Sequence, residues 1–268
     1  MVSERSRLEG LIFGLLERRL VRFVDHIYAA GEERARRYRR WGKAVTVIYG
    51  AKSLSEMPPV SDADRLAIRA AAGFAATDAV VGIAGSLGRD EAVPAVLDAL
   101  ALLPGNVKLY IIGGGEGKVA ETKALVEARG ISSRVSFTGR LPTPEYLRQT
   151  AAIDLGLALY FPTTTNQTTV VPLKLFDYMG LGIPILGSDF EELRQIITKT
   201  CACGATTDPK DPEAIRRAVE ALLRDPEGRR AMGMRARECF RTRFCQERQE
   251  EALRQSHPLF SSEDDRHG

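Results

Sequence analysis

Short apolar segments alternate with helical patterns along most of this 268-residue chain, and this alternation restricts its fold more than any other feature. The apolar segments are bounded by glycine, which is typical of strands that are buried on both faces. A strand that is followed by a helix and another strand indicates parallel pairing, with the helices covering the sheet. The sequence therefore predicts an α/β fold with a Rossmann-like, doubly wound parallel sheet.

The predicted strands of this sheet span residues 80–84, 108–112, 135–138, 155–159 and 183–186. The predicted helices span residues 62–74, 90–102, 118–129, 143–150, 172–181, 190–197, 211–224 and 227–256. Ligands of such sheets bind beyond the carboxyl ends of the strands, so any site is expected there.

The first sixty residues have a different pattern. An apolar stripe predicts a helix from about residue 4 to 25, and an arginine-rich helix follows at 32–41. A short strand at 45–49 leads into a polar, proline-containing stretch at 52–61, which is typical of a linker. We therefore predict an N-terminal helical extension and two domains, at residues 1–60 and 61–268.

The segment 171–189, VPLKLFDYMGLGIPILGSD, holds the strongest local signal for a binding site. Pro172 suits a first helical turn, and Gly180 and Gly182 suit the end of the same helix. The unpaired N–H groups and the positive dipole end at its N-terminus favour an anion, above all a phosphate. This helix also carries one carboxylate, Asp177.

Glycine-rich turns follow three predicted strands, at residues 85–88, 113–117 and 139–141. Glycine allows positive φ and a close approach of the backbone to a ligand, although tight turns also use it for structural reasons. None of the turns matches the dinucleotide fingerprint, and there is no Walker A sequence. Together with the helix of Asp177, they indicate a nucleotide site.

Composition and charge exclude several classes. The net charge of +3 gives little signal for nucleic-acid binding, and 44% hydrophobic residues are ordinary for a globular protein. The four cysteines lack zinc-type spacing, so we expect no metal site and free thiols in a reducing cytosol. No apolar run is long enough to span a membrane, and the N-terminus lacks a signal-peptide pattern. A cytoplasmic protein is therefore predicted.

Four segments in this order resemble the C-terminal half of a GT-B glycosyltransferase of the retaining group 1, or family 4, type. They are AGSLG at 84–88, VKLYIIGGGEG at 107–117, RVSFTGRLPTPEYLRQTAAIDLGLALY at 134–160 and PLKLFDYMGLGIPILGSD at 172–189. The resemblance extends over about residues 45–256. It implies a domain that binds a nucleotide-sugar donor, no metal and no cofactor beyond that substrate, and transfer of the sugar to an acceptor with retention of configuration.

The resemblance also implies which residues contact the donor. The carboxylate at the position of Asp177 accepts hydrogen bonds from the ribose hydroxyls, for which its two oxygens are suited. Leu173 and Lys174 present helix-end N–H groups to the diphosphate, and Lys174 adds a point charge. The implied donor-binding residues are Gly85, Ser86, Arg89, Gly139, Arg140, Thr169, Leu173, Lys174 and Asp177. No catalytic residue is assigned.

Some positions depart from the family pattern. Thr169 and Asp177 stand where members commonly have two glutamates, so the first position carries no charge. Ser86 stands where an arginine is expected, and Arg89 is the cation that would replace it. Because the leaving diphosphate needs its charge stabilised, these changes favour donor binding over catalysis by this chain alone.

Residues 8–29 resemble the end of the acceptor-binding first domain of such enzymes, so residues 1–60 are interpreted as its remnant. Three interpretations remain open. The chain is a donor-binding half that needs a separate acceptor-domain chain, or a non-catalytic module that pairs with a partner or a second copy through residues 8–24, or a protein that also contacts the inner membrane face. The membrane interpretation rests on the first helix and the arginines at 34–40.

Overall fold

The computed structural model describes residues 4–163 and 171–256, and the side chains from Ile12 onward within the first helix. The chain divides into two compact units. One comprises residues 50–249, and the other comprises residues 1–49 together with 250–268. The stretch 52–61, which the sequence predicts as a linker, therefore belongs to the larger unit, where it forms the 3-10 turn η2 (Leu54–Glu56).

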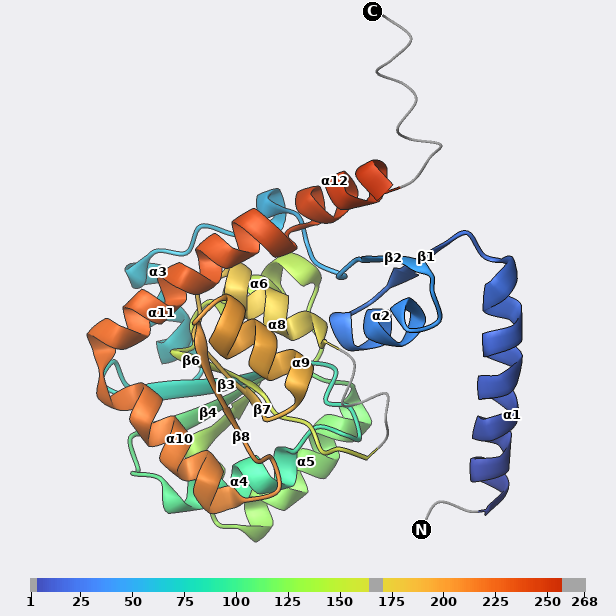
Figure 1. Cartoon of the computed structure of the whole chain (residues 1–268). Coiled ribbons are helices and arrows are strands. Elements are labelled where there is room, and N and C mark those ends of the chain that lie inside the picture. The colour runs from blue at the N-terminus through green and yellow to red at the C-terminus, as the bar shows by residue number, and fades with distance from the viewer. Residues whose placement is uncertain (1–3, 164–170, 257–268) are drawn as a thin grey trace, which may run out of the picture. The chain divides into compact units, whose positions relative to one another are not determined.

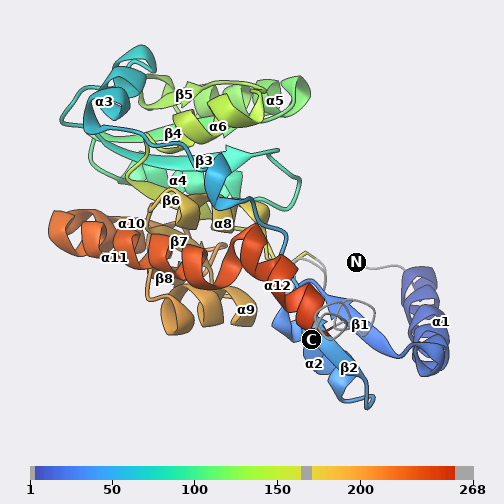
Figure 2. The same ribbon diagram turned by 90° about the horizontal axis from the view of Figure 1, so that it is seen from above.

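The larger unit is built on a six-stranded parallel sheet with the order β5-β4-β3-β6-β7-β8 (Figures 1 and 2). The strands are β3 (Ala79–Gly85), β4 (Val107–Gly113), β5 (Val135–Phe137), β6 (Leu155–Ala158), β7 (Ile185–Ser188) and β8 (Gly204–Thr207). All the pairings are parallel, as predicted. The sequence order reverses between β3 and β6, which makes their carboxyl ends the switch point of the sheet.

Helices cover both faces of this sheet. On one face lie α4 (Val93–Leu102), α5 (Glu116–Ala128) and α10 (Pro212–Arg224), and on the other lie α3 (Asp62–Ala71), α6 (Thr143–Thr150), α8 (Leu173–Gly180) and α11 (Pro226–Cys239) (Figure 1). The short helix α9 (Glu191–Arg194) continues as a π-helix, η4 (Gln195–Thr200). Branched side chains of β3, β4, α4 and α10 form the main hydrophobic core, in which Leu97, Leu109 and Ile111 are fully buried.

Several predicted elements are corrected. The single helix predicted at 227–256 is wrong, because α11 passes into the π-helix η5 (Phe240–Phe244) and Cys245 adopts a non-helical backbone before α12 (Gln246–Ser256). The strand predicted at 183–186 begins two residues later, at Ile185, because the backbone N–H of Ile183 still bonds to the end of α8. The polar edge strand β8 gave no apolar signal and was not predicted.

The smaller unit contains a two-stranded parallel sheet. Its elements are α1 (Glu4–Leu20), the 3-10 turn η1 (Val21–Phe23), β1 (His26–Ala29), α2 (Glu32–Arg39) and β2 (Ala44–Val47). The first helix is thus shorter than predicted. Apolar side chains along it are exposed, Phe13 and Phe23 most of all, at 70% and 84%. Three of the clustered arginines form ion pairs, namely Arg36 with Glu33, Arg37 with Glu17 and Arg39 with Glu32.

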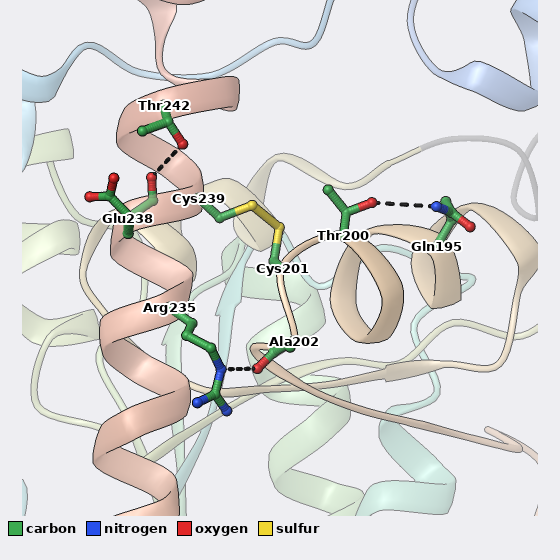
Figure 3. Close-up of a disulfide and its surroundings, with 8 residues drawn as sticks. All are labelled: Gln195, Thr200, Cys201, Ala202, Arg235, Glu238, Cys239 and Thr242. Carbon is green, nitrogen blue, oxygen red and sulfur yellow. Dashed lines mark hydrogen bonds between the residues drawn. A yellow bond between two sulfur atoms is a disulfide. The ribbon is translucent and has the colours of Figure 1, made fainter.

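The prediction of four free thiols is wrong for two of them. Cys201 at the end of η4 and Cys239 at the end of α11 form a disulfide across 38 positions of sequence (Figure 3). Beside it the Arg235 side chain of α11 donates a hydrogen bond of 2.7 Å to the carbonyl of Ala202 (Figure 3). The other two cysteines, Cys203 and Cys245, are free and buried.

Candidate functional site

A cavity of about 430 Å³ lies at the switch point of the larger unit's sheet. Its walls come from the turn after β3, the residue Tyr160 after β6, helix α6 and the start of α8. We call it the carboxyl-edge cavity, and its lining residues are Lys52, Gly85, Ser86, Gly88, Asp90, Glu91, Thr143, Tyr146, Tyr160, Pro172, Leu173, Lys174 and Asp177. Its size lies in the range typical of small-molecule sites.

The N-terminus of α8 opens on this cavity. Pro172 has an extended backbone and precedes the first helical residue, Leu173, as the sequence predicted. Pro172, at the N-cap, offers no side-chain acceptor, and of the first-turn N–H groups that of Leu175 bonds to the carbonyl of Pro172. Unpaired N–H groups and the helix dipole together favour an anionic ligand at this end.

Asp177 lies one turn further along α8 and is only 4% exposed. One carboxylate oxygen accepts a hydrogen bond from Lys52 Nζ at 2.5 Å, and the other accepts one from the hydroxyl of Tyr146 at 3.0 Å. Burial, and then the nearby charge of Asp177, raise the pKa of Tyr146 well above its usual value. Tyr146 therefore remains a proton donor at all physiological pH values.

Lys174 and Glu91 form a second charged pair in the carboxyl-edge cavity. Lys174 Nζ lies 2.8 Å from Glu91 Oε1, and the two side chains are only 7% and 5% exposed. The backbone of Glu91 is fixed because it bridges to Tyr160, with hydrogen bonds on both sides of the bridge. Burial, and then Glu91, raise the pKa of Tyr160 far above its usual value.

Gly85 allows these groups to approach one another. Its φ is +113°, and a Cβ at this position would lie 3.4 Å from Cε of Lys174, which passes over the turn. A Cβ at Gly113, in the next turn, would lie 2.6 Å from the carbonyl oxygen of Gly85. Two of the glycine turns predicted from the sequence are therefore required where the backbones of β3 and β4 end together.

Comparison with known proteins identifies the family. A sequence model of the family described as "Glycosyl transferases group 1" matches residues 64–239. The chain belongs to this family. Among curated proteins, the chitobiosyldiphosphodolichol beta-mannosyltransferase of Candida albicans is 26% identical over 146 residues, which are 51% of this chain and 30% of that protein.

Solved structures confirm the predicted GT-B fold. Sucrose-phosphate synthase from Thermosynechococcus elongatus matches with a TM-score of 0.74 and 20% identity, over 92% of this chain and 61% of that one. Anabaena HepE in complex with UDP-glucose matches with a TM-score of 0.72 and 20% identity, over 89% and 64% of the two chains. The C-terminal domain of LpcC, a group 1 protein from Francisella tularensis, is covered to 98% with a TM-score of 0.56 and 14% identity, over 72% of this chain. This chain thus spans less than two thirds of the full-length relatives.

The structure of this group 1 glycosyl transferase brings together five of the donor-binding residues implied by the resemblance, namely Gly85, Ser86, Leu173, Lys174 and Asp177. Arg89 is exposed and does not line the cavity, nor do Gly139 and Arg140. Gly139, with φ of +66°, instead bridges to Gly113 at the end of β4. Thr169 lies outside the described residues.

Sequence reasoning missed five lining residues with ionisable side chains, namely Lys52, Asp90, Glu91, Tyr146 and Tyr160. Lys52 is 125 positions from its partner Asp177 and lies in a stretch that was predicted as a linker, so no local pattern marks it. Glu91 was placed inside a helix beginning at residue 90, but α4 begins at Val93. The position of Glu91, directly after the first glycine turn, was the one available signal.

The charges around the cavity are nearly balanced. Two lysines and three carboxylates line it, and each lysine is paired with a carboxylate, Lys52 with Asp177 and Lys174 with Glu91. An ammonium group has three N–H donors, so each lysine still has donors for a ligand. A negatively charged ligand would share these lysines with carboxylates and would not meet free cations.

A larger cavity of about 840 Å³ lies at the opposite edge of the sheet. It is rich in arginine, but Arg65 and Arg69 are held by Asp154 and by the carbonyls of Ile153 and Ala152. Such ion pairs fasten α3 to the start of β6. Since parallel α/β sheets bind ligands at their carboxyl edge, the smaller cavity is the better candidate site.

Neither a metal centre nor a membrane span is found among the described residues. They contain no group of three or more His, Cys, Asp or Glu side chains that could hold a metal ion. None of the helices among them is long and apolar enough to cross a membrane.

Proposed function

We propose that this group 1 glycosyl transferase binds a nucleotide-sugar in the carboxyl-edge cavity and is the donor-binding part of an enzyme that transfers the sugar to an acceptor. The observation that carries the proposal is the uncapped N-terminus of α8, which opens on a cavity that also holds Lys174 and Asp177. Anion-binding amides, a cation and a buried carboxylate are the groups that a diphosphate joined to a ribose requires.

Asp177 has the capacity to bind the ribose without losing its present partners. A carboxylate has about four acceptor positions, and Lys52 and Tyr146 occupy two of them. The remaining two suit a vicinal diol that donates two hydrogen bonds. Lys52 and Tyr146 hold the carboxylate in place, so its orientation is set before the ligand arrives.

The diphosphate would lie at the first turn of α8. There the N–H groups of Leu173 and Lys174 and the ammonium of Lys174 would stabilise the negative charge that develops on the diphosphate as the bond to the sugar breaks. The cations near β3 that are common in the family are replaced here, so Lys174 is the main cation available to the leaving group among the described lining residues. Retention of configuration is part of this proposal, and the anomeric proton signal of the product would test it by NMR.

From the relatives we propose two classes of donor, nucleotide-linked glucose and nucleotide-linked mannose. HepE was solved with UDP and with UDP-glucose, and the Candida relative is named as a mannosyltransferase. Calorimetric titration with UDP-glucose, GDP-mannose and ADP-glucose is the direct test. Absence of binding by all three would refute the proposed donor site.

Asp177→Ala tests the position of the site. We expect affinity for the nucleotide-sugar to fall about tenfold or more, because the ribose hydroxyls lose a charged acceptor. Asp98→Ala is the matched control, since Asp98 is a half-exposed carboxylate on α4 that pairs with Arg129 away from the cavity. Equal affinities of the two variants would show that the ribose binds elsewhere. Transfer by this chain would be measured as acceptor-dependent release of the nucleoside diphosphate.

The partners and location predicted from the sequence remain proposals. The exposed apolar side chains of α1 suit a separate acceptor-domain chain, a second copy or a membrane surface, and the arginines paired with glutamates weaken the last of these. Light scattering of the purified chain would detect a dimer. We propose a cytoplasmic location, with contact to the inner membrane face as the alternative. Sedimentation with anionic vesicles would detect such membrane binding.

A further inference from the structure

Glu91 has an oxygen without a partner. Its Oε1 binds Lys174, but its Oε2 is buried and accepts no hydrogen bond from any group that the structure describes. A buried, unsatisfied acceptor costs free energy, and native structures keep few of them. Because Glu91 lines the carboxyl-edge cavity, a ligand in that cavity can supply the missing donor.

The position of Glu91 relative to the other groups indicates which part of a ligand it meets. Asp177 and Lys174 lie one turn apart on α8, and Lys174 in turn contacts Glu91, which the bridge to Tyr160 holds. A nucleotide-sugar has the same order of parts, namely ribose, diphosphate and sugar. With the ribose on Asp177 and the diphosphate at Lys174, the sugar would lie at Glu91.

The Glu91 carboxylate and the sugar hydroxyls are chemically complementary. A carboxylate is an acceptor only, and a sugar presents hydroxyl donors without charge, so the contact needs no compensation of charge. The terminal torsion of glutamate is broad, so small rotations can present the second oxygen while the first keeps Lys174. Thr169, at the position where relatives commonly have a glutamate, supplies no such carboxylate.

We propose that Glu91 is the carboxylate that accepts a hydrogen bond from a hydroxyl of the donor's sugar. This inference rests on the proposed donor site and assigns a specificity role within it. Glu91 thereby has two functions, because the oxygen bound to Lys174 also keeps that lysine beside the diphosphate. The contrasting interpretation is that Glu91 serves only as the counter-ion of Lys174.

Glu91→Gln separates the two interpretations. Glutamine keeps an acceptor for Lys174, but it removes the charge and replaces one oxygen with an amide nitrogen. Affinities for UDP and UDP-glucose would be measured by calorimetry, with GDP and GDP-mannose in parallel. If Glu91 holds the sugar, the affinity for UDP-glucose relative to that for UDP falls about tenfold in the variant. If Glu91 is only a counter-ion, the two affinities change by the same factor, which would overturn the inference.

Asp98→Asn is the matched control, because it removes one negative charge from α4 outside the cavity and leaves the pair of Glu91 and Lys174 intact. The relative affinity should stay within about twofold of wild type. An equal fall in both variants would show a general charge effect and would also overturn the inference. If the wild-type chain binds none of the four ligands, the proposed function fails, whereas binding with unchanged relative affinity in Glu91→Gln refutes only this assignment.

A second measurement covers the case in which Glu91→Gln does not fold. UDP-glucose analogues that lack single sugar hydroxyls would be titrated into the wild-type protein. Removal of one particular hydroxyl should weaken binding about tenfold. Full affinity for every analogue would contradict a carboxylate contact to the sugar.

Discussion

Tyr178 joins the helix of the candidate site to the sheet, so its hydroxyl is the first group to remove. It lies on α8, is fully buried, and accepts a hydrogen bond of 2.9 Å from the backbone N–H of Ala84 in β3. It also lies 3.3 Å from the carbonyl oxygens of Gly82 and Leu157. The ladder between β3 and β6 ends at Gly82, and the hydroxyl replaces it at the point where the strands separate.

Tyr178→Phe should therefore destabilise the larger unit. The variant leaves the buried N–H of Ala84 without an acceptor, which costs about 1–3 kcal/mol, and removes a hydrogen bond worth about 1 kcal/mol. Burial of one fewer polar oxygen offsets part of this loss, so we expect a decrease of about 2.5 kcal/mol in the free energy of unfolding. For a unit of about 200 residues this corresponds to a Tm lower by about 5–10 °C.

Urea denaturation followed by circular dichroism would measure the change. Tyr110→Phe is the matched control, because Tyr110 is a buried tyrosine whose hydroxyl donates to a side chain, the Oε1 of Gln149. Its loss should be about 1 kcal/mol or less, since the glutamine can rearrange or bind water. A loss below about 0.5 kcal/mol for Tyr178→Phe, or one no larger than in the control, would refute this reasoning.

The difference in stability between the wild type and Tyr178→Phe should depend on pH with a definite sign. Burial raises the pKa of Tyr178 well above its usual value, so the folded protein keeps the phenol proton where the unfolded chain loses it. The unfolded state then binds fewer protons above about pH 10, and the contribution of Tyr178 to stability falls as pH rises past that value. The difference between wild type and Tyr178→Phe should be constant from about pH 6 to 9 and smaller at about pH 11. A difference that grows with pH would contradict the assignment.

Three further results are expected. Lys52→Met should lower the free energy of unfolding by about 2 kcal/mol, because Asp177 stays buried with Tyr146 as its remaining hydrogen-bond partner; the partial exposure of Lys52 keeps the loss below that of a fully buried pair. Lys118→Met is the control, since it breaks an exposed pair with Glu121 and should cost less than about 1 kcal/mol. Equal urea midpoints of the two variants would contradict the importance of the Lys52–Asp177 pair. Replacing both cysteines of the disulfide with serine should cost about 4 kcal/mol, from the loop entropy of a separation of 38 positions, and reducing agent should abolish the difference from wild type. Iodoacetamide at about pH 8 should label the free thiols of Cys203 and Cys245 only in urea, because both are buried and burial raises the pKa of Cys203 to about 12. Rapid labelling of the folded protein would contradict this prediction.

The sequence alone determined the class of fold and pointed to the carboxyl edge of the sheet, where the candidate cavity lies. The alternation of apolar segments with helical patterns predicted the parallel sheet, because each pattern depends on residues that are close in sequence. Pro172 and Gly182 likewise marked the limits of α8, and Asp177 pointed to the cavity at its start. The order of the motifs was sufficient for the family.

Only the tertiary structure decided which side chains face one another. Asp177 meets Lys52 across 125 positions, and Lys174 meets Glu91 across 83, and no local spacing encodes contacts of such range. The disulfide likewise joins residues 38 positions apart, and directly after the break at Cys245 the N–H of Gln246 bonds to the carbonyl of Lys52. Local patterns fix which residues form helices and strands, whereas the partners of a buried charge depend on how those elements pack. The pairing of charged side chains in the candidate site therefore depends on the tertiary structure.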